Sequence, residues 1–373
     1  MAAPSALTAD YAGRVARLRG SLRGRGCRCL VVSNRENVRY LVGFAGSSGW
    51  VVVSADDLAL ATDSRYFERA AEQMPCGRVG LVVRGLVEYV ADYAAERQLT
   101  ELAFEAENLT YAGVKALEAA MSERGVACRL TPSSGLVESL REVKDPFELD
   151  AMRRAADLAD GAMRHARRVM RTGMTEADLA WRLERWLRDH GSGPMPFDII
   201  VASGPNAALP HATPSGRTFA AGEPVVIDLG ATVGGYCSDL TRTLFLSRLD
   251  APFDTVYAAV LAAQRGTIER VASGMTGRGA DALAREALHA DGLGAAFTHG
   301  LGHGVGLEIH ERPTVNGRSN GALADGMVFT VEPGVYLPGR GGVRIEDTVV
   351  LSDGRVEQLT HADKGDPVVA MRR

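Results

Sequence analysis

Acidic residues inside strand-like apolar segments constrain this chain more than any other feature of its sequence. A carboxylate that is buried alone costs several kcal/mol, or takes up a proton and becomes neutral. Such segments can therefore form core strands only where cations, protons or hydrogen-bond donors meet the charges. Four acidic residues in the second half of the chain have this setting: Asp228 in VVIDLG, Asp239 in YCSDL, Glu332 in VFTVEPG and Glu346 in VRIED.

Hairpin geometry is expected to bring two of the four together. Asp228 and Asp239 are symmetric about the bond between Val233 and Gly234, which lies in the turn-like segment ATVGG. If the flanking strands pair antiparallel about this point, the two aspartates lie directly opposite each other, with Cβ atoms about 4.5–5.5 Å apart. Like charges in such positions destabilise a sheet unless a cation or a shared proton lies between them.

The histidines of the same half are clustered. Three of the eight, His299, His303 and His310, fall in the segment HGLGHGVGLEIH, whose glycines let the backbone approach a ligand closely. Their spacing and the glycines argue against the helical H-E-x-x-H zinc motif. His211 lies in a loop at 203–214 that is rich in Pro, Gly and Ser, and loops often carry functional residues.

Each signal alone has an ordinary structural explanation. An aspartate pair can lie on a surface, and a histidine in a loop is more often structural than a ligand. The combination of an aspartate pair, a histidine in a glycine loop and two strand glutamates is far more specific. Carboxylate oxygens with one imidazole suit a first-row divalent ion, and manganese, cobalt, zinc and iron all fit. Four negative charges are best balanced by two such ions.

The chain is expected to form two domains. Its length of 373 residues favours that number, and strand-like and helix-like segments alternate over about the first 135 residues, which indicates an α/β domain. In the segment REVKDPFE, Asp145, Pro146 and Glu148 have the pattern of an N-cap, a first helical turn and a capping box. We therefore predict domains at 1–140 and 145–373.

Strands dominate the expected second domain, with helices at 253–271 and 278–290. The strands are predicted at 197–203, 224–229, 236–245, 327–332 and 342–351.

Composition narrows the class of protein. Lysine and arginine number 42 against 46 acidic residues, a net charge of −4, which argues against a groove that neutralises nucleic-acid phosphates. The five cysteines are scattered, as is typical of reduced thiols in a cytosolic protein. The apolar runs are too short for a signal-peptide core or a membrane span. We expect a cytoplasmic protein without nucleic-acid or membrane partners.

Five motifs in the second half resemble those of the pita-bread metallopeptidases, and specifically of the Xaa-Pro peptidases (aminopeptidase P and prolidase). The motifs are IDLG, SDLTRT, GHGVG, VEPG and RIED. In the first half, YLVGF, GSSG and TDSRY resemble the creatinase-type N-terminal domain of the same peptidases. Methionine aminopeptidases share the catalytic fold but usually lack that first domain, so they fit poorly. The resemblance implies a creatinase-like α/β domain followed by an α+β pita-bread catalytic domain.

The resemblance also implies a set of site residues. The metal ligands are, in the family's order, Asp228, Asp239, His303, Glu332 and Glu346. Asp228 is expected to bind one ion and His303 with Glu332 the other, while Asp239 and Glu346 bridge the two. The implied catalytic residues are Glu332 as general base, His211, His299 and His310 as active-site histidines outside the ligand set, and Arg344 as an arginine that supports the ligands.

The implied activity is a dinuclear-metal exopeptidase that hydrolyses the Xaa-Pro bond through a metal-bridged hydroxide, with manganese favoured over cobalt, zinc or iron. Its substrates are peptides with proline at the second position, and the resemblance implies a homodimer. Whether the enzyme trims peptides or splits dipeptides stays open. Two alternatives are a metal-dependent hydrolase of another small C–N substrate, like ectoine hydrolase or creatinase, and a non-catalytic peptide-binding relative. The retained ligands disfavour the non-catalytic alternative.

Overall fold

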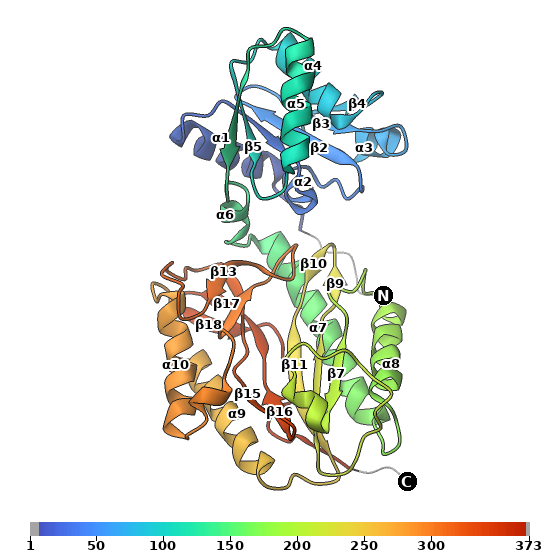
Figure 1. Ribbon diagram of the computed structural model, residues 1–373, viewed down its shortest axis with the longest axis vertical. Helices are drawn as coiled ribbons and strands as arrows, with labels where there is room; N and C mark the ends of the chain where they lie inside the picture. Colours follow the sequence, from blue (N-terminus) through green and yellow to red (C-terminus); the bar gives the residue numbers. More distant parts are fainter. Residues whose placement is uncertain (1–6, 371–373) are drawn as a thin grey trace. The chain divides into compact units, whose positions relative to one another are not determined.

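The computed structural model describes residues 7–370. These residues divide into two compact units, one of Ala9–Arg141 and one that runs from Glu142 and also includes Leu7 and Thr8. We call them the N-terminal unit and the C-terminal unit and describe each by itself (Figure 1). The predicted fold class, an α/β domain followed by an α+β domain, is confirmed.

The N-terminal unit is built on a six-stranded mixed sheet with strand order β4-β3-β2-β1-β5-β6. Its strands are β1 (Cys29–Val32), β2 (Gly49–Ser54), β3 (Leu58–Thr62), β4 (Arg78–Leu81), β5 (Glu101–Glu105) and β6 (Arg129–Ser133). Its helices are α1 (Tyr11–Gly24), α2 (Arg35–Val42), α3 (Phe67–Gln73), α4 (Leu86–Glu96), α5 (Tyr111–Glu123) and α6 (Glu138–Arg141). Strand β1 is buried along its whole length, as expected for a central strand covered on both faces.

The C-terminal unit begins with the helix that the capping pattern predicts. Asp145 and Glu148 form the capping box at the start of α7, and Pro146 occupies its first turn. The α-helices of this unit are α7 (Pro146–Val169), α8 (Glu176–Asp189), α9 (Phe253–Arg270) and α10 (Gly277–Ala290), with short 3-10 helices η1 (Gly204–Ala208) and η2 (Gly294–Ala296). In Figure 1, α9 and α10 lie side by side, as do α7 and α8. Within the described residues, no helix has the length and apolar character to cross a membrane.

The strands of the C-terminal unit form two main sheets and two short hairpins. The four-stranded sheet has the order β19-β11-β8-β7, and the five-stranded antiparallel sheet has the order β13-β12-β14-β17-β18. The strands are β7 (Ile200–Ser203), β8 (Pro224–Leu229), β9 (Thr232–Val233), β10 (Tyr236–Cys237), β11 (Leu240–Leu246), β12 (Gly302–Gly304), β13 (Glu311–Val315), β14 (Val328–Val331), β15 (Gly334–Leu337), β16 (Gly341–Arg344), β17 (Asp347–Ser352), β18 (Arg355–Gln358) and β19 (Val368–Val369).

The predicted register between Asp228 and Asp239 is wrong. Asp228 in β8 pairs with Thr241 in β11, so Asp239 lies two residues away, diagonal to Asp228 and not opposite it. The turn contains two glycines with positive φ, Gly234 at 57° and Gly235 at 88°, as a type I′ hairpin turn requires. This two-residue turn shifts the centre of the hairpin from the predicted bond to the Gly234–Gly235 bond.

Three of the four acidic residues lie at interruptions between strands rather than inside them. Asp239 lies between β10 and β11, Glu332 between β14 and β15, and Glu346 between β16 and β17. The single strands expected over 236–245 and 342–351 are therefore each divided in two, and only Asp228 is part of a strand. A residue at a break between strands is not held by the hydrogen bonds of the sheet. Its carboxylate can therefore point toward a functional site.

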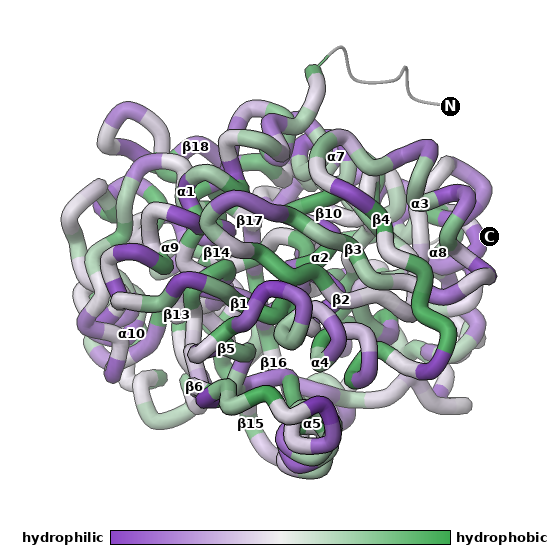
Figure 2. Tube along the Cα trace, turned by 90° about the horizontal axis from the view of Figure 1, so that it is seen from above, coloured by the Kyte–Doolittle hydropathy of each residue, from purple (hydrophilic) through white to green (hydrophobic). Residues whose placement is uncertain are grey.

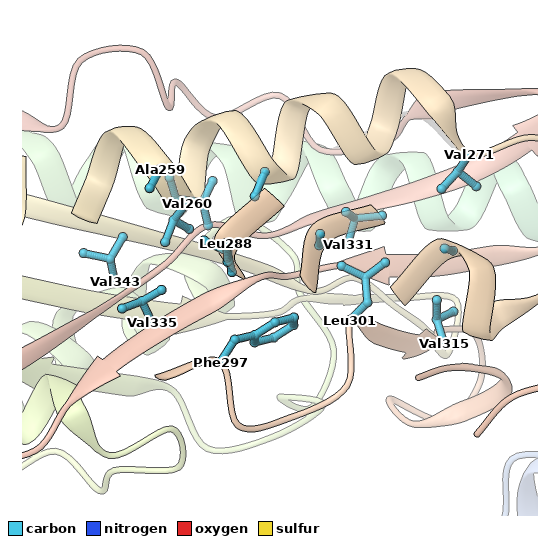
Figure 3. Close-up of a cluster of buried hydrophobic side chains, with 14 of the residues drawn as sticks. Ala259, Val260, Val271, Leu288, Phe297, Leu301, Val315, Val331, Val335 and Val343 are labelled. Atoms are coloured by element: carbon cyan, nitrogen blue, oxygen red, sulfur yellow. The ribbon is translucent and has the colours of Figure 1, made fainter. Parts of the chain in front are cut away.

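Alternation along the strands separates the core from this site. Successive strand side chains point to opposite faces, so the apolar neighbours of the acidic residues enter the hydrophobic core. These neighbours are Ile227, Val331 and Ile345, and Val343 lies two residues before Ile345; all four are fully buried. Figure 3 shows Val331 and Val343 within this packed cluster, beside Val335 and Leu301. Along the chain, strands are coloured largely as hydrophobic and the outer loops as hydrophilic (Figure 2).

Candidate metal centre and active site

All nine predicted site residues come together around one cavity in the C-terminal unit. The cavity has a volume of about 570 Å³. Its lining includes the predicted ligands Asp228, Asp239, His303, Glu332 and Glu346, and the predicted catalytic residues His211, His299, His310 and Arg344. These residues come from both main sheets and from the loops at 203–214 and 299–311, so only the tertiary fold assembles them.

The predicted ligands approach one another closely. Asp239, His303 and Glu346 each offer one donor atom, and these three atoms lie within 4.8 Å of one another. His303 Nε2 lies 3.6 Å from Asp239 Oδ2 and 3.4 Å from Glu332 Oε1. The backbone at His303 is forced close to β14, since a Cβ on the adjacent Gly302 would lie 2.0 Å from the Thr330 carbonyl oxygen. Oxygen donors around one imidazole nitrogen fit a divalent metal ion.

Two buried carboxylate oxygens support this fit directly. Asp228 Oδ1 and Asp239 Oδ1 are buried and have no hydrogen-bond partner among the residues that the structure describes. A buried acceptor without a partner costs about 1–3 kcal/mol, and more when it is charged. Both atoms belong to residues of the predicted ligand set that line the cavity. The residues present therefore fit a metal centre, which would satisfy these oxygens.

The hydrogen bonding of His303 leaves the lone pair of its Nε2 available for a metal ion. Its Nδ1 lies 3.1 Å from the Gly304 carbonyl oxygen, which can only accept, so Nδ1 carries the proton and donates. The Nε2 lone pair then points toward the carboxylates of Asp239 and Glu332. Burial lowers the pKa of His303, which favours the neutral imidazole that metal ions bind.

Without a metal ion, the carboxyl groups of the acidic cluster resist ionisation. Burial, and then the charges of neighbouring carboxylates, raise the pKa of Asp239 and of Glu346 well above the ordinary value. Burial also raises the pKa of Glu332. A divalent ion reverses this balance because it stabilises the ionised forms.

Arg344 is the principal cation of the site. Its Nη2 donates to Asp228 Oδ2 over 2.7 Å, its Nε donates to Thr241 Oγ1 over 3.1 Å, and its Nη1 donates to the Tyr336 hydroxyl over 2.9 Å. Burial alone would lower the pKa of Arg344, but Tyr336, Asp228 and the glutamates raise it well above its ordinary value. Arg344 is therefore a fixed positive charge that orients Asp228.

Tyr336 is a site residue that the sequence analysis missed. Its hydroxyl lies 2.9 Å from His299 Nε2 and accepts from Arg344. His299 Nδ1 lies 2.8 Å from the Gly300 carbonyl oxygen and must donate to it, so Nε2 accepts from Tyr336. Burial lowers the pKa of His299, consistent with this neutral form. The only available signal in the sequence was the alternation along β15. Because Val335 points into the core, the next residue, Tyr336, points to the other face of the strand.

Two threonines that hold ligand carboxylates were also missed as site residues. Thr241 Oγ1 donates to Glu346 Oε2 over 2.6 Å, and Thr330 Oγ1 donates to Glu332 Oε1 over 3.0 Å.

The two remaining predicted histidines lie at the rim of the cavity. His310 packs edge-on against His303 with ring centroids 4.2 Å apart, and His211 is exposed on its loop.

A second network of buried ion pairs and hydrogen bonds holds the backbone at Glu346. Arg242 donates from Nη1 to the Glu346 carbonyl oxygen and from Nη2 to Asp347 Oδ1 over 2.7 Å. Lys364 Nζ donates to Asp347 Oδ2. Burial would raise the pKa of Asp347, but Arg242 and Lys364 hold it below its ordinary value. This ion network fixes the backbone on both sides of the break that carries Glu346.

Comparison with known proteins places this architecture. Residues 150–353 match metallopeptidase family M24, and residues 14–143 match the creatinase/prolidase N-terminal domain. The peptidase YqhT of Bacillus subtilis (strain 168), whose name describes it as uncharacterized, is 37% identical over 351 residues, 94% of this chain and 98% of its own.

Two solved structures share both units. The Xaa-Pro dipeptidase from Bacillus anthracis has a TM-score of 0.92 and 36% identity, covering 96% of this chain and 100% of its own. The X-Pro aminopeptidase from Thermotoga maritima MSB8 has a TM-score of 0.86 and 32% identity, covering 94% of this chain and 100% of its own. The C-terminal unit thus has the pita-bread fold and the N-terminal unit the creatinase-type fold. This chain belongs to metallopeptidase family M24.

Proposed function

We propose that this protein hydrolyses the Xaa-Pro bond at the N-terminus of peptides or in Xaa-Pro dipeptides, using two divalent metal ions. The observation that carries the proposal is the meeting of four carboxylates and one imidazole in a single cavity, with two buried carboxylate oxygens left without partners among the described residues. The similarity to an Xaa-Pro dipeptidase and an X-Pro aminopeptidase over both units supports this substrate class.

The proposed ligands are the five residues Asp228, Asp239, His303, Glu332 and Glu346. Metal ions bound there would lower the pKa of a bound water and polarise the scissile carbonyl. Glu332 is the proposed general base, which would take a proton from that water. Thr330 donates to one Glu332 oxygen and so orients the carboxylate.

Proline directly after the scissile bond makes the leaving nitrogen part of a tertiary amide without an N–H. A site for such a substrate must recognise the ring by shape and must supply a proton to the departing nitrogen. The cavity lining includes the apolar residues Phe197, Ile200 and Ile309, which offer surface for a ring. We propose that His310 and His211 at the rim donate hydrogen bonds to the substrate carbonyl or carboxylate, and that His299 is held in place by Tyr336.

We further propose manganese as the working metal, because four of the five donors are carboxylates and hard oxygen ligands suit manganese better than zinc. We propose a cytoplasmic location, supported by the five cysteines, all free thiols. A homodimer is proposed from the resemblance to Xaa-Pro peptidases and can be checked by light scattering.

The test is a substrate panel with the metal-depleted protein reloaded with Mn²⁺, Co²⁺ or Zn²⁺. The panel contains Gly-Pro, Gly-Pro-Ala, the matched peptide Gly-Ala, and creatine and ectoine as small C–N substrates. We expect cleavage before proline, with Gly-Ala slower by about 100-fold, and no activity in Asp239→Ala. The ratio of Gly-Pro to Gly-Pro-Ala cleavage separates a dipeptidase from an aminopeptidase. Cleavage of creatine or ectoine in place of both proline peptides would overturn the proposal.

A further inference from the structure

Glu176, at the start of α8, is a fully buried carboxylate outside the metal centre, with 0% exposure. Its Oε1 accepts from the Ser203 amide and from the Ser203 hydroxyl, each over 2.7 Å. Its Oε2 accepts from the Ser215 amide over 3.0 Å and the Ser215 hydroxyl over 2.6 Å. Asn206 Nδ2 donates to both oxygens over 3.1 Å. One carboxylate therefore holds three residues of a single loop.

These contacts join the two ends of the loop that carries His211. Ser203 ends β7 and Ser215 follows the segment 210–214, all of which lines the cavity. The Glu176 carboxylate is the acceptor common to the donors at Ser203 and Ser215, and Arg217 Nη1 adds a bond to the Ser203 hydroxyl over 2.7 Å. The Glu176 carboxylate is the group that accepts from the backbone amides at both ends of the loop, so the position of His211 over the cavity is coupled to it.

The other side of the loop rests on the strand that carries Arg344. A Cβ at Gly342 would lie 2.3 Å from the Ala207 carbonyl oxygen, so strand and loop are in direct contact. Arg344 Nη1 donates to the Pro210 carbonyl oxygen over 3.2 Å. The residue before His211 is thus tied to the metal centre, and Glu176 supplies the second point of attachment.

We propose that Glu176 is a positioning residue that holds the His211 loop in the geometry needed to bind substrate. The inference rests on the proposed function, because it assigns His211 to substrate binding. It adds that the orientation of His211 is set by a buried carboxylate from another element, not by the loop alone.

The chemistry of the site explains why this residue is ionised. A carboxylate has two oxygens that only accept, and each faces donors from the loop. Burial alone would raise the pKa of Glu176, but the hydrogen bonds from Ser215 and Ser203 outweigh burial and lower it. In Glu176→Gln, the amide NH₂ would replace one oxygen and face donors, so one loop end would lose its acceptor.

The test is a double-mutant cycle on kcat/KM for Gly-Pro with Mn²⁺, using Glu176→Gln, His211→Ala and the double variant. We expect Glu176→Gln to lower kcat/KM by about 10- to 100-fold, mainly through KM, which is the cost of a misplaced group. The double variant should then be no worse than His211→Ala within about twofold, since coupled residues are not additive. Glu176→Asp, which keeps both oxygens, should recover part of the loss. Glu184→Gln, the same change on a partly exposed glutamate of the same helix, should have wild-type kinetics.

Two further readouts separate this role from general damage. Mn²⁺ affinity by calorimetry should be unchanged in Glu176→Gln, because the metal ligands are not touched. Hydrogen exchange of the Ser203 and Ser215 amides, which donate to Glu176, should become faster in Glu176→Gln and stay unchanged in Glu184→Gln.

The outcomes are distinguishable. Multiplicative losses in the double variant, or unchanged exchange at both amides, would overturn the inference and leave the proposed function intact. A wild-type protein that cleaves neither Gly-Pro nor a longer Xaa-Pro peptide with any metal would overturn the proposed function, and with it the assignment of His211 to substrate.

Discussion

Arg344 Nη2 lies 2.7 Å from Asp228 Oδ2. Of the four acidic residues that are predicted metal ligands, Asp228 is the only one that lies within a strand. The other oxygen of Asp228, Oδ1, has no hydrogen-bond partner in the described part of the chain. One oxygen is therefore fixed by a cation of the protein, and the other is left for a ligand. This division of roles is what a metal-binding carboxylate needs, because its orientation is set before the metal binds.

Substitution of Arg344 should break this partly buried pair. We expect Arg344→Met to lower the free energy of unfolding by about 1–3 kcal/mol, because it leaves the partly buried Asp228 carboxylate without its charged partner. Urea unfolding of the metal-free protein measures the change. The exposed Arg340 of the same hairpin is the matched control, and Arg340→Met should stay within about 0.5 kcal/mol of wild type. Equal stability of the two variants would contradict the role given to Arg344.

The acidic cluster should make the metal-free protein less stable than one of its inactive variants. Asp239 Oδ1 is buried without a partner among the described residues. Asp239→Asn removes its charge and adds a donor beside the other carboxylates. We expect this variant to be more stable than wild type by about 1–3 kcal/mol at pH 7 without metal, and to lose the stabilisation that Mn²⁺ gives the wild type. Denaturant unfolding with and without Mn²⁺ measures both, and Asp157→Asn on exposed α7 surface is the control.

The advantage of Asp239→Asn should depend on pH in a defined direction. The pKa of Asp239 is raised in the folded protein, so the folded state keeps a proton that the unfolded chain has released. The contribution of Asp239 to stability is then fully present below the ordinary carboxyl pKa of about 4 and is lost as pH rises through the raised value. The difference between variant and wild type should therefore shrink as the pH falls from 8 to 5. A constant difference over this range would show that the Asp239 carboxylate is not strained by burial.

Arg242 should matter for both stability and the metal centre. Arg242→Met removes one of the two cations paired with buried Asp347, and also the donor to the Glu346 carbonyl oxygen. We expect a loss of about 3–5 kcal/mol in unfolding free energy and weaker Mn²⁺ binding by calorimetry, because the backbone that carries Glu346 is released. The exposed Arg265 on α9 provides the control variant Arg265→Met. Unchanged Mn²⁺ affinity in a folded Arg242→Met protein would mean that the network does not position Glu346.

Local sequence patterns predicted the helices and the fold class well. The capping box at Asp145 and Glu148 is formed as expected, because its contacts are only three residues apart. The predicted pairing of Asp228 with Asp239 was wrong by two residues, since Asp228 pairs with Thr241. The segment ATVGG allows a turn centred at more than one bond, and the apolar pattern of the flanking strands fits each of these registers. The breaks at Asp239 and Glu346 could not be predicted either, since continuous apolar segments read as single strands.

The candidate site was predicted as a set of residues but not as a network. The motifs point to the ligands and the histidines, and the structure brings all of these around one cavity. Tyr336 was missed because its partners, His299 and Arg344, come from other strands or loops. Glu176 was missed for the same reason, as its contacts span 27 to 39 residues of sequence. Long-range hydrogen bonds leave no periodic signal in a sequence.

The measurement that tests the central claim most directly is a titration of the metal-free protein with Mn²⁺, in which bound metal per chain and Gly-Pro hydrolysis are followed together. The account predicts no hydrolysis without metal, a rise with added Mn²⁺, and a plateau at two bound ions per chain, with Asp239→Ala inactive throughout. Full hydrolysis by the metal-free protein, full activity of Asp239→Ala, or the absence of any bound divalent ion would contradict it.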